Sequence, residues 1–324
     1  MPPLPSSSPG AGRIVARLLP PSLLTLPVLS FQYPLKLIAS TISPTQCLTV
    51  FILSYGGGLV SNDKINLSVS IEEGAKLCLL TQGSTKIFKR TSPEHLTTQT
   101  LTARLARNAA LLLLPDPLQP FADSVYLQHQ IFHLPSDDSA SLIILDWYTE
   151  GRSARNEKWA FESFESRNDV YIDLPSPQSE GEQSNTPNQL PLRTSKLLLR
   201  DTQILTRDPS AALDELQSRM DFMSVFATLL VRGPRFEKLQ SGLLRRYSEE
   251  PRIGARNWHG EKKEKIRRFE GVVWTAAKVR GFVAVKAGGR VLEDVRAFLR
   301  SCLEEEGEEE VIGEFGRGVV MCLQ

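Results

Sequence analysis

Three short apolar runs recur in the middle of the chain, and their spacing constrains the fold more than any other feature. Each run follows a polar turn and precedes a polar segment: residues 74–80 (GAKLCLL), 108–114 (NAALLLL) and 139–145 (SASLIIL). They start 34 and then 31 residues apart. A repeat of this length predicts one supersecondary unit that stacks on its copies to share a core. Because the runs do not alternate, we expect them to be buried on both faces.

The segment before each run alternates in polarity. The alternating positions are Ile65, Leu67, Val69 and Ile71 in the first unit, Leu101, Ala103 and Leu105 in the second, and Val125, Leu127, His129 and Ile131 in the third. A period of two places these side chains on one face of a strand. Glu73 and Gly74 then predict a tight reversal into the apolar run. The sequence therefore predicts a mainly β fold of stacked β-hairpins or β-sheets, in a solenoid-like or sandwich-like arrangement with a few helices.

Strand-like patterns return in the last third of the chain. They cover residues 196–205, 272–279 and 281–287. Residues 222–231 are ambiguous, although Val, Phe and Thr favour a strand. An amphipathic helix is predicted over residues 290–305 by the helical spacing of Val291, Val295, Phe298 and Cys302. The acidic residues 304–310 oppose the helix dipole there and should fray into solvent.

We expect a single β-rich domain over residues 30–303. Residues 1–29 should form an N-terminal tail that is partly disordered. Residues 304–324 should form an acidic C-terminal tail. Two further segments, the proline-rich residues 174–194 and the basic residues 245–268, are interpreted as surface loop insertions.

Composition argues against several classes of function. Lys and Arg total 38 and Asp and Glu total 37, so the net charge gives no reason to expect a nucleic-acid partner. The basic run with Trp258 and His259 could bind nucleic acid, but a solvated loop is the favoured interpretation. No run of about 18 apolar residues is uninterrupted, so no membrane span is expected. The four cysteines form no CxxC pair; Cys47 and Cys78 fit core positions, and a reducing, cytoplasmic location is expected.

The motifs of common catalytic sites are missing from the sequence. Gly56, Gly57 and Gly58 precede a strand pattern, so they fit a positive-φ backbone and a bulge better than a phosphate-binding loop. His129 and His133 lie on one strand face about 13 Å apart, too far to share a metal. We therefore expect a protein that is not an enzyme. The alternative is a β-rich carbohydrate-active hydrolase, which needs two carboxylates about 5–9.5 Å apart in an open cleft.

Five segments resemble the urease accessory protein D family (UreD, also called UreH), in particular a eukaryotic, fungal member. They are residues 56–65 (GGGLVSNDKI), 73–75 (EGA), 80–90 (LTQGSTKIFKR), 114–124 (LPDPLQPFADS) and 145–159 (LDWYTEGRSARNEKW). Where the family commonly has Gly-Gly-Asp, this chain has Ser61, Asn62 and Asp63, so only Asp63 carries over. The motifs are good over residues 30–205 and weaker over residues 222–303.

The resemblance implies a β-rich chaperone of urease maturation. Members of the family join a helical accessory protein F and a GTPase G, dock on apo-urease and help deliver nickel, which they hold only transiently. No nucleic-acid or membrane partner is implied. Family members are described as carrying an internal water-filled passage for the metal. Such a passage needs weak, exchangeable oxygen ligands rather than a thiolate or imidazole trap.

The resemblance also selects candidate residues, none of them catalytic. Our hypothesis is that a metal conduit is lined or shaped by Asp63, Thr81, Gln82, Asp146 and Glu150. Structural or partner contacts are expected from Gly57, Gly58, Lys86, Arg152 and Arg155. We expect no tightly bound cofactor.

Overall fold

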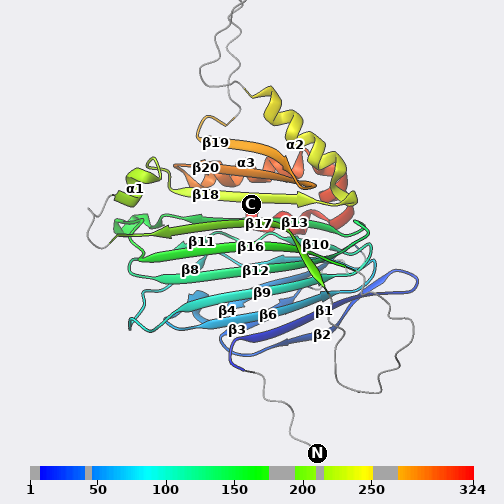
Figure 1. The fold of residues 1–324 in the computed structure, drawn as a ribbon, viewed down its shortest axis with the longest axis horizontal. Helices are drawn as coiled ribbons and strands as arrows, with labels where there is room; N and C mark the ends of the chain where they lie inside the picture. Colours follow the sequence, from blue (N-terminus) through cyan, green and yellow to red (C-terminus); the bar gives the residue numbers. More distant parts are fainter. Residues whose placement is uncertain (1–7, 41–45, 175–193, 209–214, 251–268) are drawn as a thin grey trace, which may run out of the picture.

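The computed structural model describes residues 8–40, 46–174, 194–208, 215–250 and 269–324. They form three layers: a seven-stranded sheet (sheet A), an eleven-stranded sheet (sheet B), and helices on the face of sheet B that points away from sheet A (Figure 1). The strand order in sheet A is β17 (Ser195–Thr206), β16 (Ser163–Asp173), β12 (Val125–Pro135), β9 (Thr97–Leu105), β6 (Lys64–Ile71), β1 (Ala11–Leu19) and β2 (Leu23–Phe31).

Sheet B has a main path of eight strands and three shorter strands beside it. The main path is β19 (Val272–Val279), β20 (Phe282–Gly289), β18 (Val225–Arg232), β13 (Ser141–Thr149), β10 (Ala110–Leu113), β7 (Lys76–Leu80), β4 (Leu48–Ser54) and β3 (Leu35–Ala39). The shorter strands are β5 (Gly58–Leu59), β8 (Thr85–Ile87) and β11 (Leu118–Pro120). A separate two-stranded ribbon consists of β14 (Gly151–Arg152) and β15 (Glu157–Lys158).

The helices are α1 (Glu215–Arg219), α2 (Glu237–Glu249) and α3 (Leu292–Glu304). Short helical turns are η1 (Tyr55–Gly57), η2 (Ser153–Arg155), η3 (Pro234–Phe236), η4 (Glu308–Gly313) and η5 (Arg317–Leu323). In the described parts of the chain, no helix combines the length and the apolar character of a membrane span.

Each repeating unit places its two strands in different sheets. β6, β9 and β12 are parallel neighbours in sheet A, and β7, β10 and β13 are parallel neighbours in sheet B. The predicted mainly β fold of stacked units is confirmed. Inside a unit, however, the turn carries the chain from one sheet to the other, so the two strands do not pair with each other as a hairpin. Both strands of every unit then contribute to one core between the sheets.

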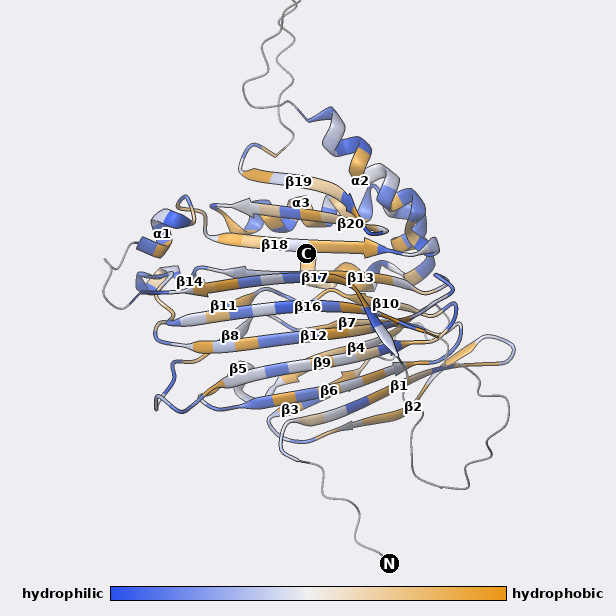
Figure 2. Ribbon diagram, in the orientation of Figure 1, coloured by the Kyte–Doolittle hydropathy of each residue, from blue (hydrophilic) through white to orange (hydrophobic). Residues whose placement is uncertain are grey.

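The burial pattern explains why the two kinds of strand differ in sequence. In β6 the alternating residues Ile65, Leu67 and Val69 are at most 3% exposed. All nine residues of β13 are buried, because sheet A covers one face and the helices cover the other. Figure 2 shows β18, which is covered by the same helices, as hydrophobic toward both of its ends. The prediction that the apolar runs are buried on both faces is confirmed.

The third alternating segment faces the opposite way from the prediction. The buried side chains of β12 are Tyr126, Gln128, Gln130, Phe132 and Leu134. The positions expected to face the core lie half-buried on the outer face instead: Val125, Leu127, His129 and Ile131. Large aromatic rings gain more from burial than β-branched side chains, so Tyr126 and Phe132 decide the orientation. Two glutamines are thereby carried into the interior.

Most of the expected N-terminal tail is part of sheet A. Residues 11–31 form β1 and β2, and β1 pairs in parallel with β6. Ile14 and Leu24 are at most 3% exposed. The proline-rich composition suggested an unpacked segment, but Pro27 lies in the edge strand β2, where a missing N–H breaks no interior ladder.

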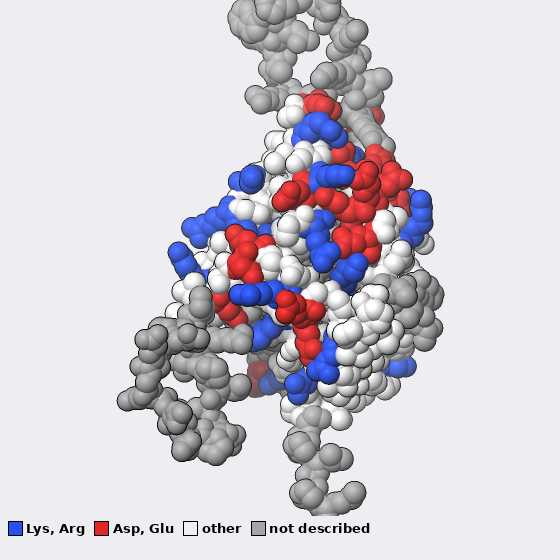
Figure 3. Space-filling view, turned by 90° about the vertical axis from the view of Figure 1, so that its right-hand side faces the viewer, with Lys and Arg blue, Asp and Glu red and all other residues white. Residues whose placement is uncertain are grey.

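The expected acidic C-terminal tail is also part of the fold. Val311 and Leu323 are fully buried against the outer face of sheet B. Glu310 accepts hydrogen bonds from the backbone N–H groups of Lys238 and Leu239, at 2.9 and 2.8 Å, and so caps the first turn of α2. The segment does not fray, because its carboxylates bind groups of the protein. Figure 3 shows them gathered among lysines and arginines on this side of the molecule.

Other predictions from the sequence are confirmed. The amphipathic helix is α3, and the strands predicted at residues 272–279 and 281–287 are β19 and β20. The ambiguous segment forms β18. Cys47 and Cys78 are buried in the core.

The two predicted insertions fall largely outside the described residues. Residues 175–193 and 251–268, the latter with Trp258 and His259, are not described. Residues 245–249 belong to α2 rather than to a loop, because Leu243 on the same helix packs into the core.

A network of ion pairs lies on the outer face of sheet A around Asp169, whose side chain is fully buried. Arg200 Nε and Arg167 Nε donate to its carboxylate at 2.7 and 2.9 Å, and His129 Nε2 lies 3.1 Å away. Burial alone would raise the pKa of Asp169, but the hydrogen bonds from Arg200, Arg167 and His129 outweigh it and lower the pKa to about 2. The ionised carboxylate therefore stabilises the pairing of β12, β16 and β17.

We expect Asp169→Asn to lower the free energy of unfolding at pH 7 by about 2 kcal/mol, because each unit of pKa shift corresponds to about 1.4 kcal/mol. The folded pKa lies below the unfolded value of 3.8, so the contribution is complete well above pH 4 and is lost as the pH falls toward 2. Urea unfolding at several pH values measures the difference. Glu165→Gln is the control on the same strand, since the described residues give Glu165 no ion-pair partner. A loss that stayed constant down to pH 2 would contradict this account.

Candidate functional site

A small cavity of about 50 Å³ lies between the two sheets. Its polar lining includes Thr81, Gln99, Asp116, Gln128, Gln130 and Asp146. A buried water needs about 10–15 Å³ and two to four polar partners. The cavity is therefore large enough, and polar enough, for a few water molecules.

Strand register aligns these polar residues with others into two rows. On the inner face of sheet A, the aligned residues of β9, β12, β16 and β17 are Gln99, Gln128, Ser166 and Gln203. On the facing side of sheet B, the aligned residues of β13, β18, β20 and β19 are Asp146, Thr228, Lys286 and Thr275. We call these two rows the polar stripe. It runs across the strands, from the cavity toward β19.

Asp146 begins the sheet B row of the polar stripe, beside the cavity, and is 2% exposed. Its carboxylate accepts hydrogen bonds from Gln128 Nε2 at 3.2 Å, Ser166 Oγ at 2.5 Å and Asn168 Nδ2 at 2.8 Å. Burial raises the pKa of Asp146, and these hydrogen bonds only partly offset the effect. The carboxyl group is thus held by neutral donors in an environment that favours its protonated form.

Three buried oxygen atoms beside the stripe have no hydrogen-bond partner among the described residues. They are Gln130 Oε1, Asn168 Oδ1 and Asp201 Oδ2. Their residues occupy aligned positions on β12, β16 and β17, next to the row of sheet A. Buried polar atoms are almost always hydrogen-bonded in proteins. These oxygens are therefore available to water or to a cation in the space between the sheets.

One end of the stripe reaches the surface at a pocket of about 330 Å³, which we call the mouth pocket. It shares Thr81 and Asp116 with the cavity. Thr81 Oγ1 donates to Asp116 Oδ2 at 3.1 Å and accepts from the backbone N–H of Asp116 at 2.7 Å. Cys322 also lines the pocket, and burial raises its pKa to about 12, so it presents a neutral thiol.

The other end opens into a second surface hollow of about 330 Å³, the β17 groove. Gln203 Nε2 donates to Thr228 Oγ1 at 3.1 Å there. Lys286 Nζ lies 2.6 Å from Asp201 Oδ1 and 3.4 Å from Thr228 Oγ1. Carboxylates therefore stand at three places in this region: Asp116 at the mouth pocket, Asp146 beside the cavity and Asp201 beside the β17 groove.

The structure brings together three of the five residues expected to line a conduit. Thr81 and Asp146 line the cavity, and Gln82 lines the mouth pocket. Asp63 instead accepts a hydrogen bond from the backbone of Val60 at 2.8 Å, within a turn. Glu150 lies 3.7 Å from Lys158 Nζ and lines neither the cavity nor its two ends.

The five residues expected to make structural or partner contacts lie outside the stripe. Gly57 has a φ of +72°, which favours glycine, and a Cβ on Gly58 would lie 2.5 Å from the carbonyl oxygen of Lys86, so a side chain there would force the backbone to shift. Arg152 pairs with Glu157 and lies 4.0 Å from the centre of the Phe121 ring. Arg155 is exposed at the end of η2.

The sequence did not single out four residues of this region, namely Asp116, Gln128, Asn168 and Asp201. Asp116 lies inside the 114–124 motif, which could have drawn attention to it. The other three lie at alternating positions of strands, and the sequence does not show which face of those strands points inward. Only the register between neighbouring strands shows that these polar residues lie together.

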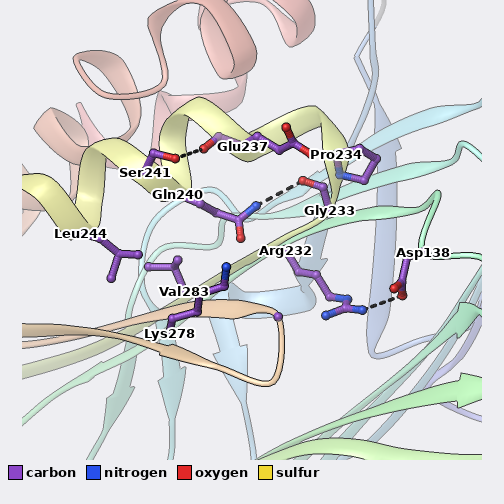
Figure 4. Close-up of a pocket in the computed structure, with 11 residues that line it drawn as sticks. Asp138, Arg232, Gly233, Pro234, Glu237, Gln240, Ser241, Leu244, Lys278 and Val283 are labelled. Carbon is purple, nitrogen blue, oxygen red and sulfur yellow. Dashed lines mark hydrogen bonds and ion pairs between the residues drawn. The ribbon is translucent and has the colours of Figure 1, made fainter.

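A larger surface pocket, of about 450 Å³, lies between α2 and the turn that joins β19 to β20 (Figure 4). Its polar groups bind one another: Arg232 Nη2 lies 2.7 Å from Asp138 Oδ1, and Gln240 Nε2 donates to the carbonyl of Gly233 at 3.2 Å. In Figure 4 the Lys278 amine points into the pocket without a drawn partner, but one amine alone does not make a converging set of ligand groups. The polar stripe is therefore the stronger candidate site.

The stripe offers oxygen atoms rather than a preformed metal centre. Among the described residues, no group of three or more His, Cys, Asp or Glu side chains is placed to hold a metal ion. A cation in the stripe would be coordinated by only one or two of its carboxylate, amide or hydroxyl groups at a time. Such ligands suit hard or borderline cations and exchange readily.

Thr81→Val should destabilise the protein by about 1–3 kcal/mol, because it removes the hydroxyl that both donates to and accepts from the buried Asp116. Thr81→Ser keeps the hydroxyl and should retain most of the stability. Urea unfolding of the three proteins measures the effect. If Thr81→Val proved as stable as the wild type, the contact would not hold the mouth pocket together.

Comparisons with known proteins agree with the features above. The sequence profile of the UreD urease accessory protein family matches residues 22–313. An uncharacterized urease accessory protein ureD-like from Schizosaccharomyces pombe is 34% identical over 83% of this chain and 84% of its own length. Urease accessory protein 4 from Cryptococcus neoformans is 30% identical over 87% and 86%. Urease accessory protein D from Arabidopsis thaliana is 32% identical over 64% and 63%. This chain belongs to the UreD urease accessory protein family.

Proposed function

We propose that this protein assembles with the accessory proteins F and G on apo-urease and helps to deliver nickel along the polar stripe. Its family supports a role in urease maturation. The observation that carries the finer proposal is the alignment of polar side chains on both sheets from the cavity to the β17 groove, with the mouth pocket adjoining the cavity at Thr81 and Asp116. An interior row of this kind has no role in hydrophobic packing.

The ligand chemistry of the stripe supports transfer rather than storage. The oxygen donors along it and at its ends include Asp116 at the mouth pocket, Asp146 beside the cavity and Asp201 beside the β17 groove. Protons and metal ions compete for the same carboxylate oxygens. Because burial raises the pKa of Asp146, this carboxyl regains a proton readily and releases a cation readily. Nickel, as the cargo, would be held loosely at each step.

The cavity argues against the alternative of a carbohydrate-active hydrolase. Ligand pockets commonly measure about 300–1,000 Å³, whereas the space around Asp146 measures about 50 Å³. Asp146 is 2% exposed, so it does not face an open cleft. A non-catalytic role in maturation accounts for these features better.

Asp146→Asn tests the proposal, because it removes the charge while keeping the shape of the side chain. In a reconstitution from purified apo-urease, F, G and this protein, we expect the variant to assemble normally but to slow urease activation at least tenfold. Nickel content and urease activity are measured over time. Asn168→Leu, which places an apolar side chain beside the stripe, should act in the same way.

The matched control is Asp137→Asn, which removes an exposed carboxylate in the turn before β13. It should activate urease at the wild-type rate. Normal activation by assembled Asp146→Asn and Asn168→Leu proteins would rule out transfer along the stripe.

A further inference from the structure

Sheet B extends two strands farther than sheet A on the side of β19. The side chain of Gln203 on β17 donates a hydrogen bond to Thr228 on β18, so the last strand of sheet A lies over β18. Among the described residues, no strand of sheet A lies over β20 and β19. Helices α2 and α3 cover only the opposite face of these strands, as Figure 1 shows. On this inner face Phe282 of β20 is buried in the core between the sheets, whereas Lys286 of β20 and Val273 and Thr275 of β19 are exposed and line the β17 groove.

Large apolar side chains are exposed around this groove. Val273, on its floor, is 50% exposed, and Phe222, next to the lining residue Met223, is 54% exposed. Val279, on the same face of β19 as Val273, is 40% exposed. Ile204, on the outer face of the adjacent strand β17, is 61% exposed. Grouped apolar side chains on a protein surface commonly mark an interaction site.

β17 itself offers a free strand edge. It is twelve residues long and, within the part of the chain that the structure describes, pairs only with β16. The next strand position in a sheet lies about 4.8 Å away. A strand added to β17 would therefore lie over β20, within the groove. Addition of an extended segment to an open edge is a recurring mode of peptide recognition.

The charge of the groove specifies the chemistry of the segment. Lys286 is the one charged residue that lines it, and its side chain is 49% exposed. The remaining lining residues are uncharged, and most are apolar. An apolar segment that carries one carboxylate near its middle is complementary to this surface.

We propose that an extended segment of a partner in urease maturation adds to β17 as a new strand of sheet A. Its apolar side chains contact β20 and β19, and a carboxylate pairs with Lys286. The inference rests on the proposed function for the choice of partner. It also links docking to the stripe: a competing carboxylate draws Lys286 away from Asp201 and frees the oxygens of Asp201 at this end.

Site-specific photo-crosslinking tests the location. A photoreactive residue at position 204 should crosslink to apo-urease, F or G in the purified assembly, and the same residue at position 23, an exposed apolar site on the opposite edge strand β2, should not. Crosslinking of position 204 to a second copy of this chain, or to none of the proteins in an assembled complex, would overturn the proposal.

Charge reversal tests the chemistry. Lys286→Glu should weaken the affinity of the crosslinked partner at least tenfold, and the milder Lys286→Met should weaken it less. Lys278→Glu is the matched control, because Lys278 is exposed on the neighbouring strand but lines the pocket beside α2. Wild-type affinity of both Lys286 variants would overturn the proposal.

The same samples separate this inference from the proposed function. If the wild-type assembly forms but activates no urease, transfer along the stripe fails, while the crosslinks and affinities still decide whether β17 is the docking edge. If Lys286→Glu binds its partner with wild-type affinity and the assembly activates urease normally, only the docking proposal fails.

Discussion

Parallel, in-register stacking of the repeating units is the constraint on which the rest of the structure depends. Because the strands of successive units in a sheet run side by side without a shift, residues at equivalent positions form rows across the sheet. Apolar positions yield the continuous core of the sandwich. The same geometry aligns Gln128 with Ser166 and, through the antiparallel partner β17, with Gln203. One rule of assembly thus generates both the core and the polar stripe.

The polar groups inside a β-sandwich must form hydrogen bonds with one another, because a buried polar group without a hydrogen bond lowers the stability by about 1–3 kcal/mol. Asp146 does so with three neutral donors rather than with a cationic partner. An arginine there would fix the charge permanently, as it does at Asp169 on the outer face. The two aspartates show that the partners decide the effect of burial: the pKa of Asp169 is lowered, whereas that of Asp146 is raised.

The sequence predicted the mainly β class, the stacked units, the doubly buried runs and α3, because these follow from local periodicity. It could not assign the inner face of β12, where both sets of alternating positions contain apolar residues and Tyr126 and Phe132 outweigh Val125 and Ile131. Gln128 and Gln130 therefore escaped notice. The N- and C-terminal segments were misjudged for a related reason: their partners, β6 and the outer face of sheet B, are distant in sequence. Thr81, Gln82 and Asp146 were found through the family motifs they belong to.

The packing of η4 and η5 has a consequence for synthesis of the chain. These turns cover the outer face of β7 and its neighbours in sheet B. Lys76 on β7 donates hydrogen bonds to Glu314, which lies 238 residues later in the sequence. β7 and β10 consequently emerge from the ribosome long before the residues that shield them. Contacts at such separation slow folding, so this hydrophobic face of sheet B stays uncovered until the last turns have been synthesised.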